Sequence, residues 1–282
     1  MQLKVAAKRA IKRQVRRAWL TFVRTNQAFS REDLLTALHK LGVQPGSVLL
    51  VHSSFDNFTG FEGKATDVNL TLFESVTPTG TILMPTLPFS GTAIDYVSSG
   101  VLFDARKTPS RMGLLTELFR RQPGTLRSAH PTHSVAACGR LAEELIADHH
   151  RAKTPCGKGT PYGRLLDIGG NILFMGTDIG VMTFFHYVEE ELESQLPFSP
   201  FTANVFTLQC RDKDGELRTT ETRLFEPQRS RSRNLQKLVP FLKKRNVWRE
   251  ARVGRLVLIL LSAEGVLSTC REMVRLGIYP YD

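Results

Sequence analysis

The stretch FFHYVEEELE, residues 184–193, places a histidine and a carboxylate where they could act together. His186 and Glu189 are three positions apart, so they share one face if the segment is helical. A carboxylate beside an imidazole can orient a general base and stabilise its charged form. The same spacing suits half of a metal site in carboxylate bundles. No second HxxE or ExxH occurs in the chain, so the pattern favours a proton relay without a metal.

The acids around this pair predict contacts with a cationic ligand. Several glutamates occupy the C-terminal half of the expected helix, where negative charge opposes the helix dipole. We expect acids in that position when a positively charged ligand compensates them. Glu190, and Asp178 just before the helix, are therefore candidate substrate-binding residues.

Two loops carry hydroxyl groups at expected element boundaries, where backbone amides and helix N-termini bind phosphate well. Helix capping is the alternative role for such residues. The loops are VHSS and TPSRMG, and their candidate residues are Ser53, Ser54, Thr108, Ser110 and Arg111.

A third candidate is His130, which precedes a proline in RSAHPTHS and has His133 close by. The proline predicts a turn, and turn residues held by a rigid scaffold often serve functional sites.

Alternating strand and helix patterns position these residues and predict an α/β fold around a mainly parallel central sheet. Ser30 and Asp33 form a predicted capping box that opens a helix over 31–41, and Gly42 ends it. Apolar runs predict buried strands. The predicted strands are 47–54, 80–86 and 171–177, and the other predicted helices are 66–76, 113–121 and 139–149.

The pattern changes after Pro197, where alternating segments flank Asp214-Gly215 and predict a hairpin. A helix over 233–243, a strand over 254–261 and a helix over 263–276 are expected to follow. We therefore divide the chain into a basic helix (1–27), an acyl-coenzyme A-binding and catalytic α/β core (28–197), and an α+β portion packed on it (198–282).

The net charge of +11 is concentrated at the N-terminus. Apolar residues recur there at helical spacing, which predicts a basic amphipathic helix. This helix could pack on the body or on a second copy in a homodimer, or it could lie on an anionic membrane surface. A charge confined to one helix argues against nucleic-acid binding. The basic residues of segment 1–24, which has no acid, are Lys4, Lys8, Arg9, Lys12, Arg13, Arg16, Arg17 and Arg24.

The cellular location follows from what the sequence lacks. No apolar run approaches the roughly 20 residues that cross a bilayer, and the N-terminus has no secretory pattern. The four cysteines form no CxxC pair. We expect a cytoplasmic protein, peripheral at the inner membrane face if the basic helix binds lipid.

Several motifs in the same order resemble the aminoglycoside 3-N-acetyltransferase family, also called the antibiotic N-acetyltransferases. The resemblance covers about residues 30–190, and a weaker match lies near the C-terminus. Two positions depart from the family pattern, because GVMT (180–183) keeps only the threonine of D-x-N-T and the TPSRMG loop is one glycine shorter. The matching motifs are LLVHSS, GTILMPT, TPSRMGLLTELFRRQPGTLRSAHPTHSVAACG, GKGTPYGRL, ILFMG and TFFHYVEE.

The resemblance implies acetyl-coenzyme A as donor, an amine of an aminoglycoside or amino sugar as acceptor, and no metal. It implies that His186 and Glu189 are catalytic and that His130 lies beside the acceptor. The residues that match positions near coenzyme A are Ser53, Ser54, Thr108, Ser110 and Met112.

Three alternatives remain open from the sequence. Cys138 could act as a nucleophile with His130 as its base. The protein could be a biosynthetic N-acyltransferase that modifies a nucleotide-linked or polysaccharide amino sugar near the membrane. It could also be a non-catalytic scaffold at a membrane surface. For the direct reaction, we expect His186 to have a pKa near 7, which suits a base at neutral pH.

Overall fold

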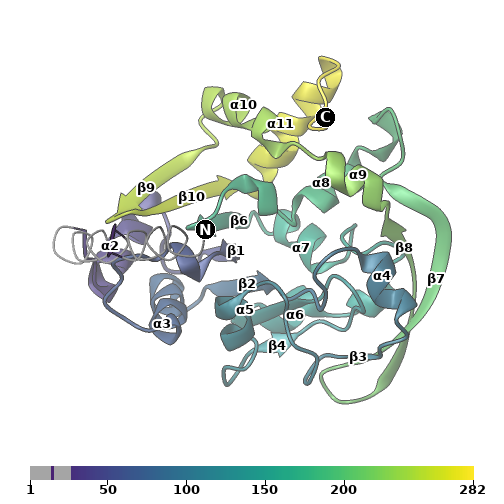
Figure 1. Cartoon of the computed structure of the whole chain (residues 1–282), viewed down its shortest axis with the longest axis horizontal. Coiled ribbons are helices and arrows are strands. Elements are labelled where there is room, and N and C mark those ends of the chain that lie inside the picture. The colour runs from purple at the N-terminus through teal and green to yellow at the C-terminus, as the bar shows by residue number, and fades with distance from the viewer. Residues whose placement is uncertain (1–13, 16–26) are drawn as a thin grey trace, which may run out of the picture.

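The computed structural model describes residues 14–15 and 27–282 (Figure 1). The basic helix predicted at the N-terminus lies outside these residues, apart from Gln14, Val15 and Gln27. Within the described ranges, no helix combines the length and hydrophobicity that crossing a membrane requires.

A sheet of seven strands forms the centre of the described chain. Its three inner strands, β2, β1 and β6, are parallel, and the outer strands pair in antiparallel fashion. The predicted α/β class is confirmed. In spatial order, the strands are β4 (Leu126–Arg127), β5 (Val135–Gly139), β2 (Thr81–Pro85), β1 (Val48–Ser53), β6 (Asn171–Met175), β10 (Leu256–Ser262) and β9 (Arg249–Val253).

The first four residues of β1 are all apolar because both faces of this strand are covered. Val48 and Leu50 face the core that contains α6, α7, α8 and α11, whereas Leu49 and Val51 face the core beneath α2, α3 and α5. Alternate side chains of a strand point to opposite faces, so a strand covered on both faces must be apolar at every position.

Most of the predicted helices are present, several with shorter bounds. The helix expected over 233–243 is instead a 3₁₀ turn over 235–238 followed by a helix that runs to Lys244, and the helices over 93–98, 161–167 and 227–232 are not among those predicted. The predicted capping box of α2 is present, and Gly42 ends that helix in the left-handed conformation with a φ of 107°. The helices are α2 (Arg31–Leu41), α3 (Ala65–Val76), α4 (Ala93–Ser98), α5 (Leu114–Phe119), α6 (Ala142–Ile146), α7 (Pro161–Asp167), α8 (Phe185–Glu191), α9 (Pro227–Ser232), α10 (Val239–Lys244) and α11 (Ala263–Arg275), with short 3₁₀ turns η1 (Phe55–Asn57), η2 (His149–Arg151), η3 (Ile179–Val181), η4 (Glu193–Gln195) and η5 (Leu235–Leu238).

The chain after Pro197 contributes to two sheets. The predicted hairpin forms from β7 (Phe201–Arg211) and β8 (Leu217–Phe225), and β7 also pairs with β3 (Phe103–Asp104). This second sheet runs along the edge of the molecule opposite α2 (Figure 1). Strands β9 and β10 instead extend the central sheet beside β6. The C-terminal residues are therefore built into the core as well as packed on it.

Candidate active site

His186 and Glu189 form a hydrogen-bonded pair on α8. His186 Nδ1 lies 3.1 Å from a carboxylate oxygen of Glu189. The His186 side chain is 16% exposed, whereas that of Glu189 is fully buried. Phe185 and Val188 on the same helix pack in the core, which fixes the helix and thus the direction of both polar side chains. Because a carboxylate can only accept, Nδ1 carries the proton and Nε2 keeps a free lone pair.

Two residues that the sequence did not single out hold the other oxygen of Glu189. Arg233 Nε donates to it at 2.7 Å, and the Tyr281 hydroxyl donates at 2.5 Å. These partners lie 44 and 92 positions further along the chain. No local spacing could reveal them, although a buried carboxylate requires such partners.

This arrangement sets the charges of the pair. Burial raises the pKa of Glu189, but the Arg233 charge and the hydrogen bonds from His186 and Arg233 outweigh it and leave the pKa lowered. Burial, and then the Arg233 charge, lower the pKa of His186 to about 4, against the opposing effect of Glu189. The expectation of a pKa near 7 is therefore wrong, because burial and Arg233 disfavour the imidazolium. His186 is neutral at physiological pH.

His186 opens into a cavity of about 460 Å³. One wall comes from segment 87–93, which follows β2, and another from segment 225–233 at the end of β8 and in α9. Met112 and His133 complete the lining. The His133 ring meets that of His186 edge-on at 5.3 Å between centroids. The cavity lies beyond the carboxyl ends of β2 and β6, the usual place for ligands in open α/β sheets.

His130 does not line this cavity. It is fully buried, and its Nδ1 accepts hydrogen bonds from the backbone N–H groups of Thr132 at 3.3 Å and His133 at 3.1 Å. Its ring stacks on His149 with centroids 4.5 Å apart. These contacts let His130 shape the turn that presents His133. The turn predicted from the sequence contains both His130 and His133. Of these two, His133 lines the cavity and His130 does not.

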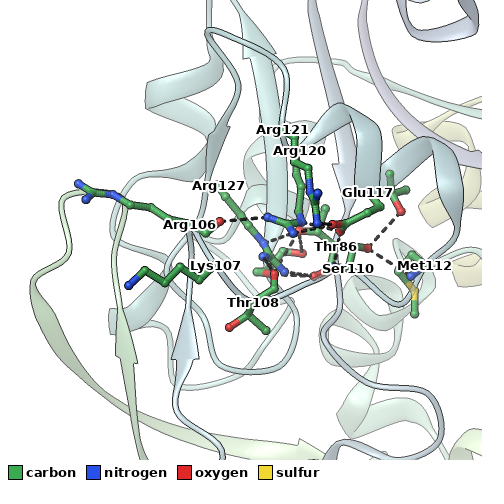
Figure 2. A network of polar contacts seen from close by, with 12 residues as sticks. Thr86, Arg106, Lys107, Thr108, Ser110, Met112, Glu117, Arg120, Arg121 and Arg127 are labelled. Atoms are coloured by element: carbon green, nitrogen blue, oxygen red, sulfur yellow. Dashed lines mark hydrogen bonds and ion pairs between the residues drawn. The ribbon is translucent and has the colours of Figure 1, made fainter. Parts of the chain in front are cut away.

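The TPSRMG loop is held by an internal polar network (Figure 2). Glu117 accepts a hydrogen bond from the Ser110 N–H at 2.8 Å and pairs with Arg120 at 2.6 Å. The buried Arg127 donates to the carbonyl oxygen of Thr108 at 2.5 Å. Among the predicted loop residues, only Met112 lines the cavity with His186.

Three backbone amides of this loop already have partners. Ser110 N–H donates to Glu117, Arg111 N–H to the carbonyl of Leu87 at 2.8 Å, and Met112 N–H to the Ser110 hydroxyl at 3.2 Å. They are consequently not free to bind phosphate or an oxyanion. The side chain of Arg111 is exposed.

The other predicted residues lie elsewhere. Ser53 ends β1 with its hydroxyl buried and without a partner among the described residues, and Ser54 precedes η1. Asp178 caps η3 and lines a different cavity of about 470 Å³ with Arg255. The structure thus brings His186, Glu189 and Met112 together, and it places the remaining predicted site residues outside this cavity. Among residues 14–15 and 27–282, no group of three metal-binding side chains comes together.

Glu190 points away from the cavity, toward the loop before α7. Its carboxyl group accepts hydrogen bonds from the Thr154 hydroxyl at 2.5 Å and from the Cys156 N–H at 3.1 Å. Burial raises the pKa of Glu190 to about 8, and these hydrogen bonds oppose the shift.

We expect Glu190→Gln to gain stability relative to the wild type as the pH rises. The carboxyl group titrates near 4.5 when unfolded and near 8 when folded. The folded state therefore binds more protons between these values, and wild-type stability falls as the pH increases through that window. Urea unfolding at several pH values should show a relative gain of about 3 kcal/mol between pH ~5 and ~8. Glu144→Gln, at an exposed position, is the control, and a pH-independent difference for Glu190→Gln would contradict the expectation.

The comparisons with known proteins agree with the motifs. A family model described as aminoglycoside 3-N-acetyltransferase matches residues 50–275. Aminoglycoside N(3)-acetyltransferase III of Acinetobacter baumannii is 35% identical over 173 residues, which are 57% of this chain and 60% of that relative. A prophage-derived aminoglycoside N(3')-acetyltransferase-like protein, YokD, of Bacillus subtilis (strain 168) is 29% identical over 62% of this chain and 68% of its own length.

Solved structures agree over a larger part of the chain. Aminoglycoside acetyltransferase AAC(3)-Xa is 25% identical, has a TM-score of 0.77, and aligns over 92% of this chain and 98% of its own. A mutant of AAC(3)-IVa, solved in complex with a gentamicin, is 25% identical with a TM-score of 0.72, over 88% of this chain and 89% of its own. The family match covers most of the sequence and includes α8 and its histidine. The chain therefore belongs to the aminoglycoside 3-N-acetyltransferase family.

Proposed function

We propose that this protein transfers an acetyl group from acetyl-coenzyme A to an amine of an aminoglycoside or amino sugar. The single observation that carries the proposal is the His186–Glu189 pair, hydrogen-bonded at 3.1 Å and facing a cavity. Family membership supports the reaction type, and the relatives are named as N(3)-acetyltransferases.

In the proposed reaction, the amine nitrogen attacks the acetyl carbonyl directly. Its proton becomes strongly acidic once the new C–N bond forms, so even a weakly basic imidazole can accept it. His186 Nε2 takes this proton while Glu189 holds Nδ1–H and favours the charged imidazole. The C–S bond then breaks, and the proton passes to the departing thiolate. The products are the amide and free coenzyme A.

The donor is proposed to enter past Met112. Met112 belongs to the loop that resembles the coenzyme A-binding loop of the family, and it also lines the cavity beside His186. Its neighbour Arg111 is exposed and is available to a phosphate of the donor. Contact of residues 1–24 with a membrane and assembly into a homodimer stay predictions.

A covalent route through Cys138 is disfavoured by the position of that residue. Cys138 lies on β5 and does not line the cavity, and burial raises the pKa of its thiol above the usual value. The thiolate is the nucleophilic form of cysteine, so this environment opposes nucleophilic catalysis.

The experiment is an assay of free-thiol release from acetyl-coenzyme A with a panel of aminoglycosides and of free and phosphorylated amino sugars. We expect release that depends on the amine, and we expect Cys138→Ser to retain at least half of the wild-type rate. Absence of release across the panel would reject the acetyltransferase assignment. Loss of activity in Cys138→Ser, with an acetylated cysteine in the wild type, would favour the covalent route.

A further inference from the structure

The cavity beside His186 contains no carboxylate among the described residues that line it. Residues 1–13 and 16–26, which the structure does not describe, contain no Asp or Glu and cannot supply one. The charged side chains that do line it are Arg231 and Arg233. A polycationic acceptor would thus meet arginines and no compensating acid in this cavity.

The acids of α8 and the following turn are occupied elsewhere. Glu190 is bound by Thr154 and Cys156, as described above. Glu191 lies 3.4 Å from Lys158 and 3.7 Å from Arg271, and Glu193 pairs with Arg223 at 2.9 Å. The sequence alone suggested that the acids of this helix bind a cationic ligand. In the structure, residues of the protein itself already bind Glu190, Glu191 and Glu193.

A carboxylate behind the cavity wall is also engaged. Asp95 accepts a hydrogen bond of 2.7 Å from the hydroxyl of Thr92, which lines the cavity, and the two residues form the N-terminal cap of α4. Asp95 itself is not among the lining residues. Its role as a cap explains its presence without an acceptor.

Both arginines have N–H groups that donate no hydrogen bond to the described residues. Arg233 donates its Nε–H to Glu189, but its buried Nη2 has no partner among the described residues. Arg231 is exposed at the cavity, and it makes no hydrogen bond or ion pair with any residue in the described part of the chain. Buried polar groups normally have hydrogen-bond partners. The Nη2 side of the Arg233 guanidinium, called its free edge below, therefore points to a ligand that can accept hydrogen bonds.

We propose that the acceptor carries an anionic group, a phosphate or a carboxylate, close to its reactive amine, and that Arg231 and the free edge of Arg233 bind it. Guanidinium groups match these anions in geometry as well as in charge. The inference rests on the proposed N-acetyl transfer, and it narrows the acceptor to an acidic amino sugar, such as a phosphorylated or nucleotide-linked one.

The position of Arg233 assigns the anion to the acceptor rather than to coenzyme A. Arg233 shares Glu189 with His186, and its guanidinium lies 5.5 Å from the ring of Phe225, which in turn lies 4.1 Å from the His186 ring. The anion would thus bind close to the reacting carbonyl. In coenzyme A, the whole pantetheine arm separates the thioester from the nearest phosphate. A phosphate of the donor would therefore bind farther from His186.

The test compares glucosamine with glucosamine 6-phosphate, which differ only in the phosphate, and adds UDP-glucosamine and kanamycin. We expect kcat/KM for a phosphate-bearing acceptor to exceed that for glucosamine by about tenfold or more, the usual size of a charge-assisted contact. Kanamycin is expected to be the poorest acceptor. Equal or better turnover of kanamycin would overturn the proposal.

Arg231→Gln is the diagnostic variant, and Arg229→Gln is its matched control. Arg229 lies on the same short helix, but its guanidinium covers the ring of Phe198 at 4.2 Å and does not line the cavity. We expect Arg231→Gln to reduce the preference for the phosphorylated acceptor to near parity and Arg229→Gln to preserve it. A rise only in the KM for acetyl-coenzyme A would instead place the anion on the donor and overturn the proposal.

A binding measurement separates failure of this inference from failure of the proposed reaction. Calorimetry with UDP-glucosamine and the catalytically disabled His186→Ala protein reports on the anion site without turnover. Binding that weakens about tenfold in His186→Ala/Arg231→Gln would support the anion site even if no acceptor were acetylated. Equal binding by both proteins, or no binding by either, would overturn it.

Discussion

Replacing His186 by alanine is expected to lower kcat by about 10³-fold, within the usual range for loss of a general base. The variant keeps the cavity and its arginines but has no group to take the proton from the attacking amine. His39→Ala, at an exposed position of α2, should retain wild-type activity and control for the substitution itself. Steady-state thiol release measures both variants, and near wild-type turnover by His186→Ala would remove this residue from the mechanism.

The pH dependence of the same reaction adds a second readout. Because burial lowers the pKa of His186 to about 4, the imidazole stays neutral from pH ~6 to ~9. The wild-type rate should therefore rise across this range only because the acceptor amine loses its proton. The alanine variant should show the same rise from a lower rate. An inflection near pH 6.5 in the wild type alone would mean that His186 titrates there and would contradict the lowered pKa.

Replacing Arg233 by alanine is expected to destabilise the protein by about 3 kcal/mol at neutral pH, the usual cost of breaking a buried ion pair. Glu189 is fully buried, so loss of the guanidinium leaves a carboxylate with an incomplete set of partners. Urea unfolding measures the difference. Arg229→Ala removes a guanidinium that stacks on Phe198 and should cost less than about 1 kcal/mol.

The deficit of Arg233→Ala should depend on pH in a defined direction. In the wild type, the pKa of Glu189 is lowered from 4.5, so its stabilising contribution is present above that value and is lost as the pH falls further. In the variant, burial without Arg233 raises this pKa, and stability falls as the pH rises above 4.5. The difference between the two proteins should therefore shrink toward pH ~4. A deficit that grows on acidification would show that the pair is not what stabilises this region.

The sequence determined the elements whose signals are local. The capping box of α2, the two-sided apolar pattern of β1 and the turn at Asp214-Gly215 each depend on neighbouring residues, and all are present in the structure. The spacing of His186 and Glu189 also sufficed to place them on one helix face, because three residues make nearly one helical turn.

Only the tertiary structure decided what surrounds this pair. Arg233 and Tyr281 reach Glu189 because the chain returns to α8 after the β7–β8 hairpin and again near Asp282, and no periodic pattern encodes such returns. The same long-range packing buries His130 and lowers the pKa of His186. It also turns Glu190 toward the loop before α7 and leaves arginines rather than acids at the cavity. Spacing fixes which side chains share an element, but burial and charge depend on contacts between distant segments, and these define the chemistry of the site.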